Sequence, residues 1–243
     1  QDGSDFTFTN TYSVTPEDST PTGDGEGSVT ITKMLDGRSL NEGEFTFRMT
    51  DAEGNVVSEG TNDAAGNVEL GGIIFEKPGT YSYTIREVDN GLGGVTYDTS
   101  VYTATAIVTD DQDGTLSVAW EVKAAGGEAL DAVTFANSYK AAPTSVSLGA
   151  AKRLDGRALK DGEFTFELKD QDGNVVSSAK NDENGAVAFD TISFDKAGTY
   201  KYTVTEAAGS DATITYDNTV YNVTITVTDD GNGSLSASVD TGD

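Results

Sequence analysis

Apolar and polar side chains alternate with a period of two along much of this chain. Residues 45–49, 81–87 and 101–108 each show the alternation, which is typical of a strand with one buried face. Glycine, asparagine and aspartate separate these runs, as in residues 51–55 and 110–114, and such residues favour tight turns. No stretch has a convincing helical period. The pattern therefore predicts an all-β chain built from β-sandwich domains.

The whole pattern occurs twice, at an offset of 119 residues. K-x-L-D-G-R begins at Lys33 and again at Lys152. Four further motifs recur at the same offset without a gap, namely G-E-F-T-F, G-N-V-V, G-T-Y and Y-D. Solenoid repeats have periods of about 20–50 residues, so a period this long indicates two tandem domains.

The two copies differ at their ends. Copy 1 continues to a predicted last strand at 133–139, whose equivalent in copy 2 would lie beyond residue 243. Residues 5–13, however, contain the F-x-N-x-Y pattern of that last strand. We therefore divide the chain into a detached last strand (1–13), a linker rich in Pro, Gly and Ser (14–27), domain 1 (28–141) and domain 2 (142–243), which lacks a last strand of its own.

Three polar residues of copy 1 fall on faces that the alternation assigns to the core. Lys33, Glu87 and Asn137 share the parity of the apolar residues in their strands, so their side chains are predicted to point inward. Copy 2 has Lys152 and Glu206 at the matching positions. An amine or a carboxyl group is costly to bury without a partner, so these residues need a joint explanation.

Five motifs occur together in this chain: K-x-L-D-G-R, G-E-F-T-F, G-T-Y-x-Y-T-x-x-E, Y-D-x-x-x-Y and F-x-N-x-Y. Together they resemble the isopeptide-forming CnaB-like domains of Gram-positive pilins and surface adhesins, in particular the streptococcal-type pilin isopeptide linkage domain. The resemblance covers nearly all of 28–243 and the segment 5–13. It implies two tandem Ig-like (CnaB-type) β-sandwiches, with an isopeptide bond in domain 1 between Lys33 and Asn137, assisted by Glu87.

Elementary chemistry is compatible with such a bond. In a dry core, loss of water lowers the pKa of a lysine and raises the pKa of a glutamate. A neutral amine is a nucleophile, and a protonated carboxyl group can polarise a carboxamide and move protons. The alternative, which the sequence leaves open, is that the three side chains form a buried hydrogen-bonded network without a covalent bond.

Copy 2 lacks an asparagine to match Lys152 and Glu206. Our hypothesis is donor-strand complementation, in which residues 5–13 of the same or a neighbouring chain complete domain 2 and bring Asn10 to Lys152. The alternative is that residues 5–13 are an idle segment at a fragment boundary.

Composition narrows the function further. The chain has 41 acidic and 15 basic residues, a formal net charge of −26, and neither Cys nor His. Disulfides, imidazole bases and the common zinc sites are therefore excluded, and we expect no cofactor and no metal. Repulsion from phosphate groups makes nucleic acid and membrane poor partners. The acidic run 110–114 lacks the distal glutamate of a calcium loop and is interpreted as a hairpin turn.

These observations favour a structural role. We expect a stalk or shaft module of a Gram-positive adhesin or pilus, not an enzyme beyond single-turnover formation of its own cross-links. Expected partners are neighbouring repeats, other copies through residues 5–13, and a host protein or glycan bound by other domains. We expect an extracellular, cell-wall-anchored protein whose signal and anchor lie outside these residues. A host-binding adhesin module and a pilus backbone subunit remain alternatives.

Overall fold

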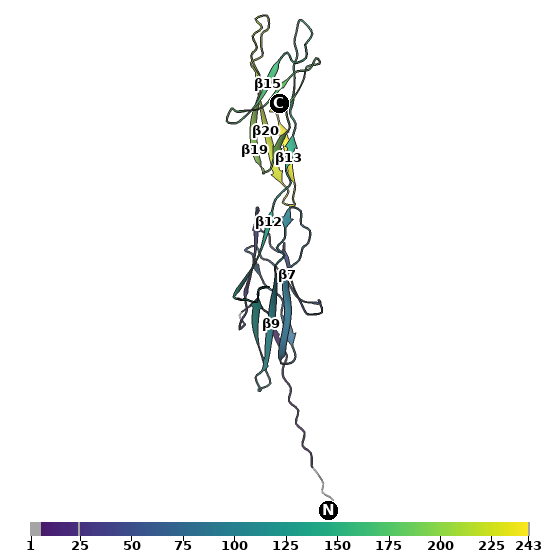
Figure 1. Cartoon of the computed structure of the whole chain (residues 1–243), viewed down its shortest axis with the longest axis vertical. Coiled ribbons are helices and arrows are strands. Elements are labelled where there is room, and N and C mark those ends of the chain that lie inside the picture. Colours follow the sequence, from purple (N-terminus) through teal and green to yellow (C-terminus); the bar gives the residue numbers. More distant parts are fainter. Residues whose placement is uncertain (1–5, 24, 243) are drawn as a thin grey trace, which may run out of the picture. The chain divides into compact units, whose positions relative to one another are not determined.

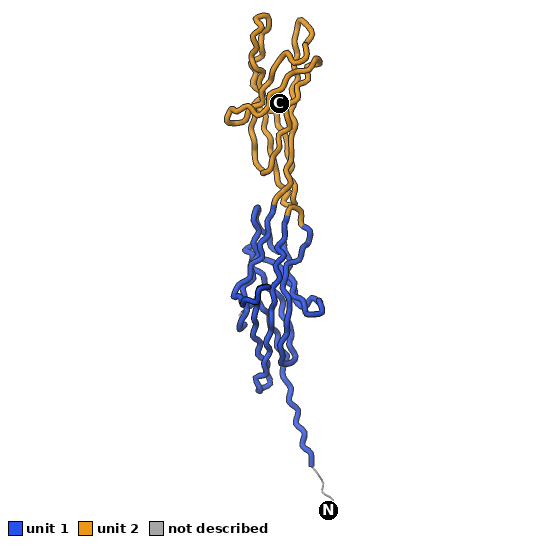
Figure 2. Tube along the Cα trace, in the orientation of Figure 1, with its two compact units in different colours: residues 1–91, 95–139 blue, residues 92–94, 140–243 orange. Residues whose placement is uncertain are grey.

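The computed structural model describes residues 6–23 and 25–242. The secondary structure of these residues consists of β-strands, with no helix among them (Figure 1). The prediction of an all-β fold with two tandem sandwich domains is confirmed. Unit 1 comprises residues 1–91 and 95–139, and unit 2 comprises residues 92–94 and 140–243 (Figure 2). In the described residues, no helix is long and apolar enough to cross a bilayer.

Unit 1 is built from two main sheets. The larger has the strand order β11-β10-β9-β7-β3-β4, the smaller has the order β5-β2-β12-β8, and β1 pairs separately with β6. The strands are β1 (Glu17–Ser19), β2 (Thr30–Asp36), β3 (Thr46–Thr50), β4 (Val56–Thr61), β5 (Asn67–Val68), β6 (Ile73–Phe75), β7 (Gly79–Glu87), β8 (Val95–Thr96), β9 (Val101–Asp110), β10 (Leu116–Lys123), β11 (Ala129–Leu130) and β12 (Ala132–Tyr139).

The core of unit 1 lies between these sheets. Alternate residues of β12 are buried, as its period of two predicts. From this strand Phe135 projects toward the larger sheet, where its ring centre lies 5.1 Å from that of Phe47 and 5.2 Å from that of Tyr102. The last strand of unit 1 therefore contributes side chains to the core.

Part of the predicted linker 14–27 is folded. Residues 17–19 form β1, which pairs with β6, and the indole nitrogen of Trp120 donates to Ser19 Oγ at 2.9 Å. Thr22 is buried, and its hydroxyl accepts a hydrogen bond from the backbone of Leu70. A three-residue strand is too short to show an alternating pattern, and the composition of the segment resembles that of a linker.

Unit 2 contains β13 (Thr144–Val146), β14 (Gly149–Ala151), β15 (Thr165–Asp170), β16 (Val175–Lys180), β17 (Ala186–Ala188), β18 (Ile192–Phe194), β19 (Gly198–Glu206), β20 (Val220–Asp229) and β21 (Leu235–Asp240). Its main sheet has the order β16-β15-β19-β20-β21, faced by the pairs β13-β18 and β14-β17. By the 119-residue offset, β14 and β17 correspond to β2 and β5. No strand among the described residues of unit 2 takes the place that β12 holds in unit 1.

One buried asparagine in each unit holds a turn to the core. In unit 1, Asn62 Oδ1 accepts a hydrogen bond from Phe45 N at 2.8 Å, and its Nδ2 donates to the carbonyl groups of Asn41 and Asp63. In unit 2, Asn181 makes the equivalent three contacts. A buried backbone group without a hydrogen-bond partner lowers the stability of the fold. Each asparagine side chain supplies a partner to three backbone groups, so its removal would leave all three unsatisfied.

We predict that Asn62→Ala lowers the free energy of unfolding of unit 1 by about 2–4 kcal/mol, since several backbone groups lose their partner at once. Trp120 is the only tryptophan of the chain and is buried in unit 1, so its fluorescence during urea unfolding reports on this unit. The control Asn90→Ala alters an exposed residue and should change the value by less than about 0.5 kcal/mol. Equal effects of the two variants would contradict the prediction.

Candidate functional site

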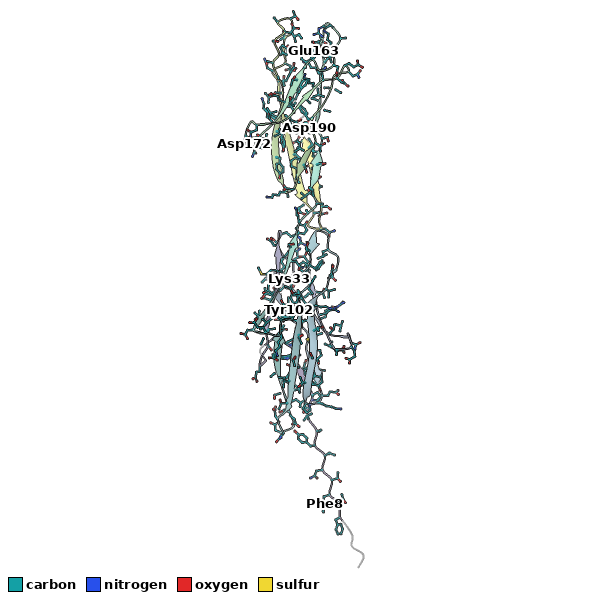
Figure 3. All side chains as sticks on the ribbon, viewed as in Figure 1. Phe8, Lys33, Tyr102, Glu163, Asp172 and Asp190 are labelled. Atoms are coloured by element: carbon teal, nitrogen blue, oxygen red, sulfur yellow. The ribbon has the colours of Figure 1, made fainter. Side chains whose placement is uncertain are left out.

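Three strands bring Lys33, Glu87 and Asn137 together inside unit 1. Lys33 lies on β2 and Asn137 on β12, and these strands run parallel with Phe135 level with Lys33 and Asn137 level with Leu35. Lys33 and Asn137 therefore lie diagonally on the same face of the smaller sheet. Glu87 reaches them from the end of β7 in the larger sheet. Figure 3 labels Lys33 within unit 1.

Glu87 bridges the other two side chains. Lys33 Nζ donates to Glu87 Oε2 at 2.8 Å, and Asn137 Nδ2 donates to Glu87 Oε1 at 2.7 Å. All three residues are buried, and the side chains of Lys33 and Glu87 are 0% exposed. The ammonium nitrogen also lies 4.5 Å from the ring centre of Phe45. The amine and the carboxamide thus contact the same carboxyl group in a site without access to bulk water.

Asp98 fixes the orientation of the carboxamide. Its backbone N–H donates to Asn137 Oδ1 at 2.7 Å, and its carboxylate accepts a hydrogen bond from Ala136 N at 2.8 Å. The carbonyl oxygen of Asn137 therefore faces a donor while its amide nitrogen faces Glu87. The sequence analysis did not assign this role to Asp98. The signal available was the Tyr-Asp pair, which recurs in copy 2 at Tyr216 and Asp217.

Burial shifts the protonation equilibria of the pair toward the neutral forms. Loss of water lowers the pKa of Lys33 below that of an exposed lysine, and it raises the pKa of the Glu87 carboxyl group. The hydrogen bond and the charge attraction between the two groups oppose both shifts but do not reverse them. Transfer of one proton from the ammonium to the carboxylate gives a neutral amine beside a carboxylic acid, which are the forms that amide chemistry requires.

Unit 2 contains the same ion pair, but among the described residues no amide side chain is hydrogen-bonded to its carboxyl group. Lys152 Nζ donates to Glu206 Oε2 at 2.7 Å and lies 4.3 Å from the ring centre of Phe164. The second oxygen, Glu206 Oε1, is buried and has no hydrogen-bond partner among the described residues. A cavity of about 450 Å³ adjoins the pair, and its lining includes Phe166 and Tyr221.

The structure does not place Asn10 at this second site. Residues 6–16, which we call the tail, form no strand, and Asn10 is exposed. Phe8, on the tail in Figure 3, is 92% exposed. Residues 1–5 of the predicted detached strand lie outside the described residues.

The acidic run 110–114 forms the turn between β9 and β10. Asp110 Oδ1 accepts a hydrogen bond from Gln112 N, and Asp113 Oδ1 accepts one from Thr115 N. In the described part of the chain, no group of three or more Asp, Glu, His or Cys side chains is arranged to hold a metal ion.

Comparisons with known proteins place this geometry in a family. The family model described as "Spy0128-like isopeptide containing domain" (FctA) matches residues 29–140 and again residues 148–243. The comparison with curated proteins gives no significant match.

Several solved structures are also similar to the chain. The major pilin T-13 of Streptococcus pyogenes has 18% identity and a TM-score of 0.39, over 88% of this chain and 91% of that one. Another major pilin structure from Streptococcus pyogenes has 17% identity and a TM-score of 0.38, over 86% and 89% of the two chains. The pilus adhesin SpaC of Lactobacillus rhamnosus GG has 14% identity and a TM-score of 0.28, over 88% of this chain and 27% of that one.

The two family matches together cover most of the chain and follow its two units. The resemblance drawn from the five sequence motifs is thereby confirmed at the level of the family. The chain belongs to the Spy0128-like isopeptide containing domain family, with two copies of the domain in tandem.

Proposed function

We propose that this chain is a structural stalk module whose unit 1 is closed by an isopeptide bond between Lys33 and Asn137. The observation that carries the proposal is the bridging carboxyl group of Glu87, which contacts the amine at 2.8 Å and the carboxamide at 2.7 Å in a buried site. Burial also shifts the pKa values of Lys33 and Glu87 toward their neutral forms, which supports a reactive role for the pair.

The reaction balances within the three side chains. Neutral Lys33 Nζ attacks Cγ of Asn137, the new C–N bond forms, and negative charge develops on Asn137 Oδ1 beside the backbone N–H of Asp98, which stabilises it. Protonated Glu87 first gives its proton to Nδ2 of Asn137 and then, as a carboxylate, takes one from the attacking nitrogen. The bond from Cγ to Nδ2 then breaks and ammonia leaves. Each domain reacts once, so the chemistry is self-maturation and not turnover.

The position of the bond suits a load-bearing role. It would join β2 to β12, the first and last long strands of the unit 1 sandwich, and close a loop of roughly 104 residues, which by chain entropy contributes about 4–5 kcal/mol. A force applied to the two ends of the unit would then be carried by the covalent bond and not by the hydrogen bonds and packing of the sandwich. In a chain without cysteine, an amide cross-link can serve where secreted proteins use disulfides. We accordingly propose a location on the outside of a Gram-positive cell wall.

In unit 2, we propose that Lys152 and Glu206 perform the same chemistry once an asparagine is supplied. Asn10, in the F-x-N-x-Y segment of the tail, is the candidate. The alternative of a host-binding adhesin module would require a ligand groove. The cavity of unit 2 adjoins Lys152 and Glu206, as β12 adjoins Lys33 and Glu87 in unit 1, which favours a strand over a host ligand as its occupant.

The first prediction concerns the bond in unit 1. The test uses the Asn10→Ala variant, so that only unit 1 can react. With Glu87 retained, the intact mass of this protein should be about 17 Da below the mass calculated from its sequence, which is the mass of one ammonia. Glu87→Gln keeps the shape of the side chain but cannot exchange the proton, so it should retain that ammonia. A tryptic digest should show the Lys33 peptide joined to the Asn137 peptide.

Two comparisons make this measurement decisive. An N-terminal glutamine can itself lose ammonia, but Gln1 is common to both variants and cancels in the comparison. Glu59→Gln changes an exposed glutamate and should leave the cross-link intact. Separate Lys33 and Asn137 peptides from the native sequence would refute the proposed bond.

A second prediction tests the stalk role directly. When the chain is stretched by its two ends in a single-molecule experiment, the roughly 104 residues from Lys33 to Asn137 should not extend, which withholds about 350 Å of contour length. Glu87→Gln should release this length in one additional unfolding event. Equal contour lengths for the two proteins would show that unit 1 carries no covalent clamp.

A further inference from the structure

One position beside β12 departs from the regular ladder of the smaller sheet. β8 lies at the edge of this sheet and pairs with β12 in antiparallel register, with Thr96 level with Ser138. Two residues further along each strand, the same register places Asp98 level with Ala136. The N–H of Ala136 points to this side, because it donates to Asp98. A regular antiparallel ladder would therefore join Asp98 and Ala136 by two backbone hydrogen bonds.

Side-chain groups take the place of both backbone bonds. Ala136 N donates to Asp98 Oδ2 at 2.8 Å, where the ladder would have the carbonyl oxygen of Asp98. Asp98 N donates to Asn137 Oδ1 at 2.7 Å, where the ladder would have the carbonyl oxygen of Ala136. The carboxylate of Asp98 thus substitutes for a strand carbonyl. Its backbone N–H is released from the ladder and contacts the carboxamide of Asn137 instead.

A tight turn holds the carboxylate of Asp98 in this position. Its second oxygen, Oδ1, accepts a hydrogen bond from Ser100 N at 2.8 Å, as aspartate side chains do in turns. Partial burial favours the neutral acid, but the hydrogen bonds from Ser100 and Ala136 outweigh it and keep the pKa of Asp98 below its usual value. The carboxylate is therefore ionised, and both of its oxygens serve as acceptors.

The N–H of Asp98 determines which way the carboxamide of Asn137 faces. A backbone N–H can only donate, so the carboxamide atom next to it must be the oxygen. Nδ2 then faces Glu87 Oε1, to which it donates at 2.7 Å. The reverse orientation would bring Nδ2 against the N–H of Asp98, with two donors face to face. The carbonyl oxygen is therefore held by a donor suited to negative charge, and Glu87 is left to act on the nitrogen.

We propose that Asp98 is a positioning residue for amide formation in unit 1. Its carboxylate substitutes for a strand carbonyl, which frees its backbone N–H to hold Asn137 Oδ1 and directs Nδ2, the leaving group, to Glu87. This inference rests on the isopeptide bond proposed for unit 1.

The covalent step is unchanged by this role. The bond from Lys33 Nζ to Cγ of Asn137 forms, the bond from Cγ to Nδ2 breaks, and ammonia leaves with a proton that Glu87 supplied. Glu87 recovers a proton from Nζ. The carboxylate of Asp98 neither gives nor takes a proton, so its contribution is made entirely through the position of its N–H.

Removal of the carboxylate should affect the reaction more than the fold. In Asp98→Ala, Ala136 N loses its acceptor, but the carbonyl group of residue 98 can take its place in a regular ladder pair. The N–H of residue 98 then turns to the carbonyl group of Ala136. The backbone remains paired, whereas the carboxamide of Asn137 loses the donor that orients it.

The test measures the rate of bond formation in newly made protein. The full 243-residue chain is produced by cell-free translation and sampled over time. One half of each sample is denatured and digested to quantify the Lys33 peptide joined to the Asn137 peptide. The other half is treated briefly with protease before denaturation, which gives the folded fraction. We expect Asp98→Ala to lower the rate per folded molecule on the order of 100-fold, the effect of losing one donor to a developing negative charge.

Three further variants separate positioning from stability. Thr99→Ala changes an exposed residue of the same turn and should react at the native rate. Thr22→Ala takes the acceptor from another backbone group, Leu70 N, so it should lower stability and keep the rate per folded molecule. Asp98→Asn keeps the size of the side chain but has one acceptor oxygen for two N–H donors. It should slow the reaction as Asp98→Ala does.

The other outcomes are distinguishable. A native rate per folded molecule in Asp98→Ala and Asp98→Asn would overturn this inference and leave the proposed function intact. Equal slowing in Thr22→Ala and Asp98→Ala would also overturn it, because the rate would then follow the stability of the unit. Absence of the joined peptide in the native sequence would refute the proposed function, and with it the reaction that Asp98 is proposed to assist.

Discussion

The sandwich of unit 1 depends on one buried carboxyl group that serves two partners. Glu87 accepts hydrogen bonds from an amine and from an amide at once, and removal of any member would leave the others desolvated and unpaired, which costs several kcal/mol. The surrounding elements are arranged to keep this contact dry. β12 supplies the amide and also Phe135, which fills the adjacent space between the sheets. The same strand therefore completes both the core and the hydrogen-bonded triad of Lys33, Glu87 and Asn137.

Among the described residues, unit 2 repeats the rest of this arrangement. Its main sheet, its Asn181 turn and its ion pair of Lys152 with Glu206 are all formed. The differences from unit 1 are local: β14 is three residues long where β2 has seven, one carboxyl oxygen has no partner in the described residues, and a cavity adjoins the ion pair. The ion pair of Lys152 with Glu206 is therefore formed in the described residues without a contact to a last strand.

The sequence predicted much of this structure, for identifiable reasons. Alternation located β3, β7, β9 and β12 within one or two residues, since each has one buried face, and the 119-residue offset predicted the second domain. Other features leave no such trace. The fold of residues 17–19 rests on contacts of Ser19 and Thr22 with distant residues. The hydrogen bond from Asp98 to Asn137 uses a backbone N–H, which every residue except proline possesses, so the recurring Tyr-Asp pair marked the position without revealing its role. The attachment of the tail through Thr15 likewise uses only backbone atoms.

The parallel pairing of β2 with β12 has a consequence for the uncross-linked protein. The chain enters the sandwich at the start of β2 and leaves it at the end of β12, and the two strands are in register over seven residue pairs. Opposed forces on the two ends therefore slide these strands along each other in shear, so the evenly spaced hydrogen bonds of a parallel ladder must break together and not one by one, as they would when a hairpin unzips. The parallel ladder thus resists loading in this direction without any covalent bond, and it would keep the amine and the carboxamide of the proposed cross-link aligned under tension.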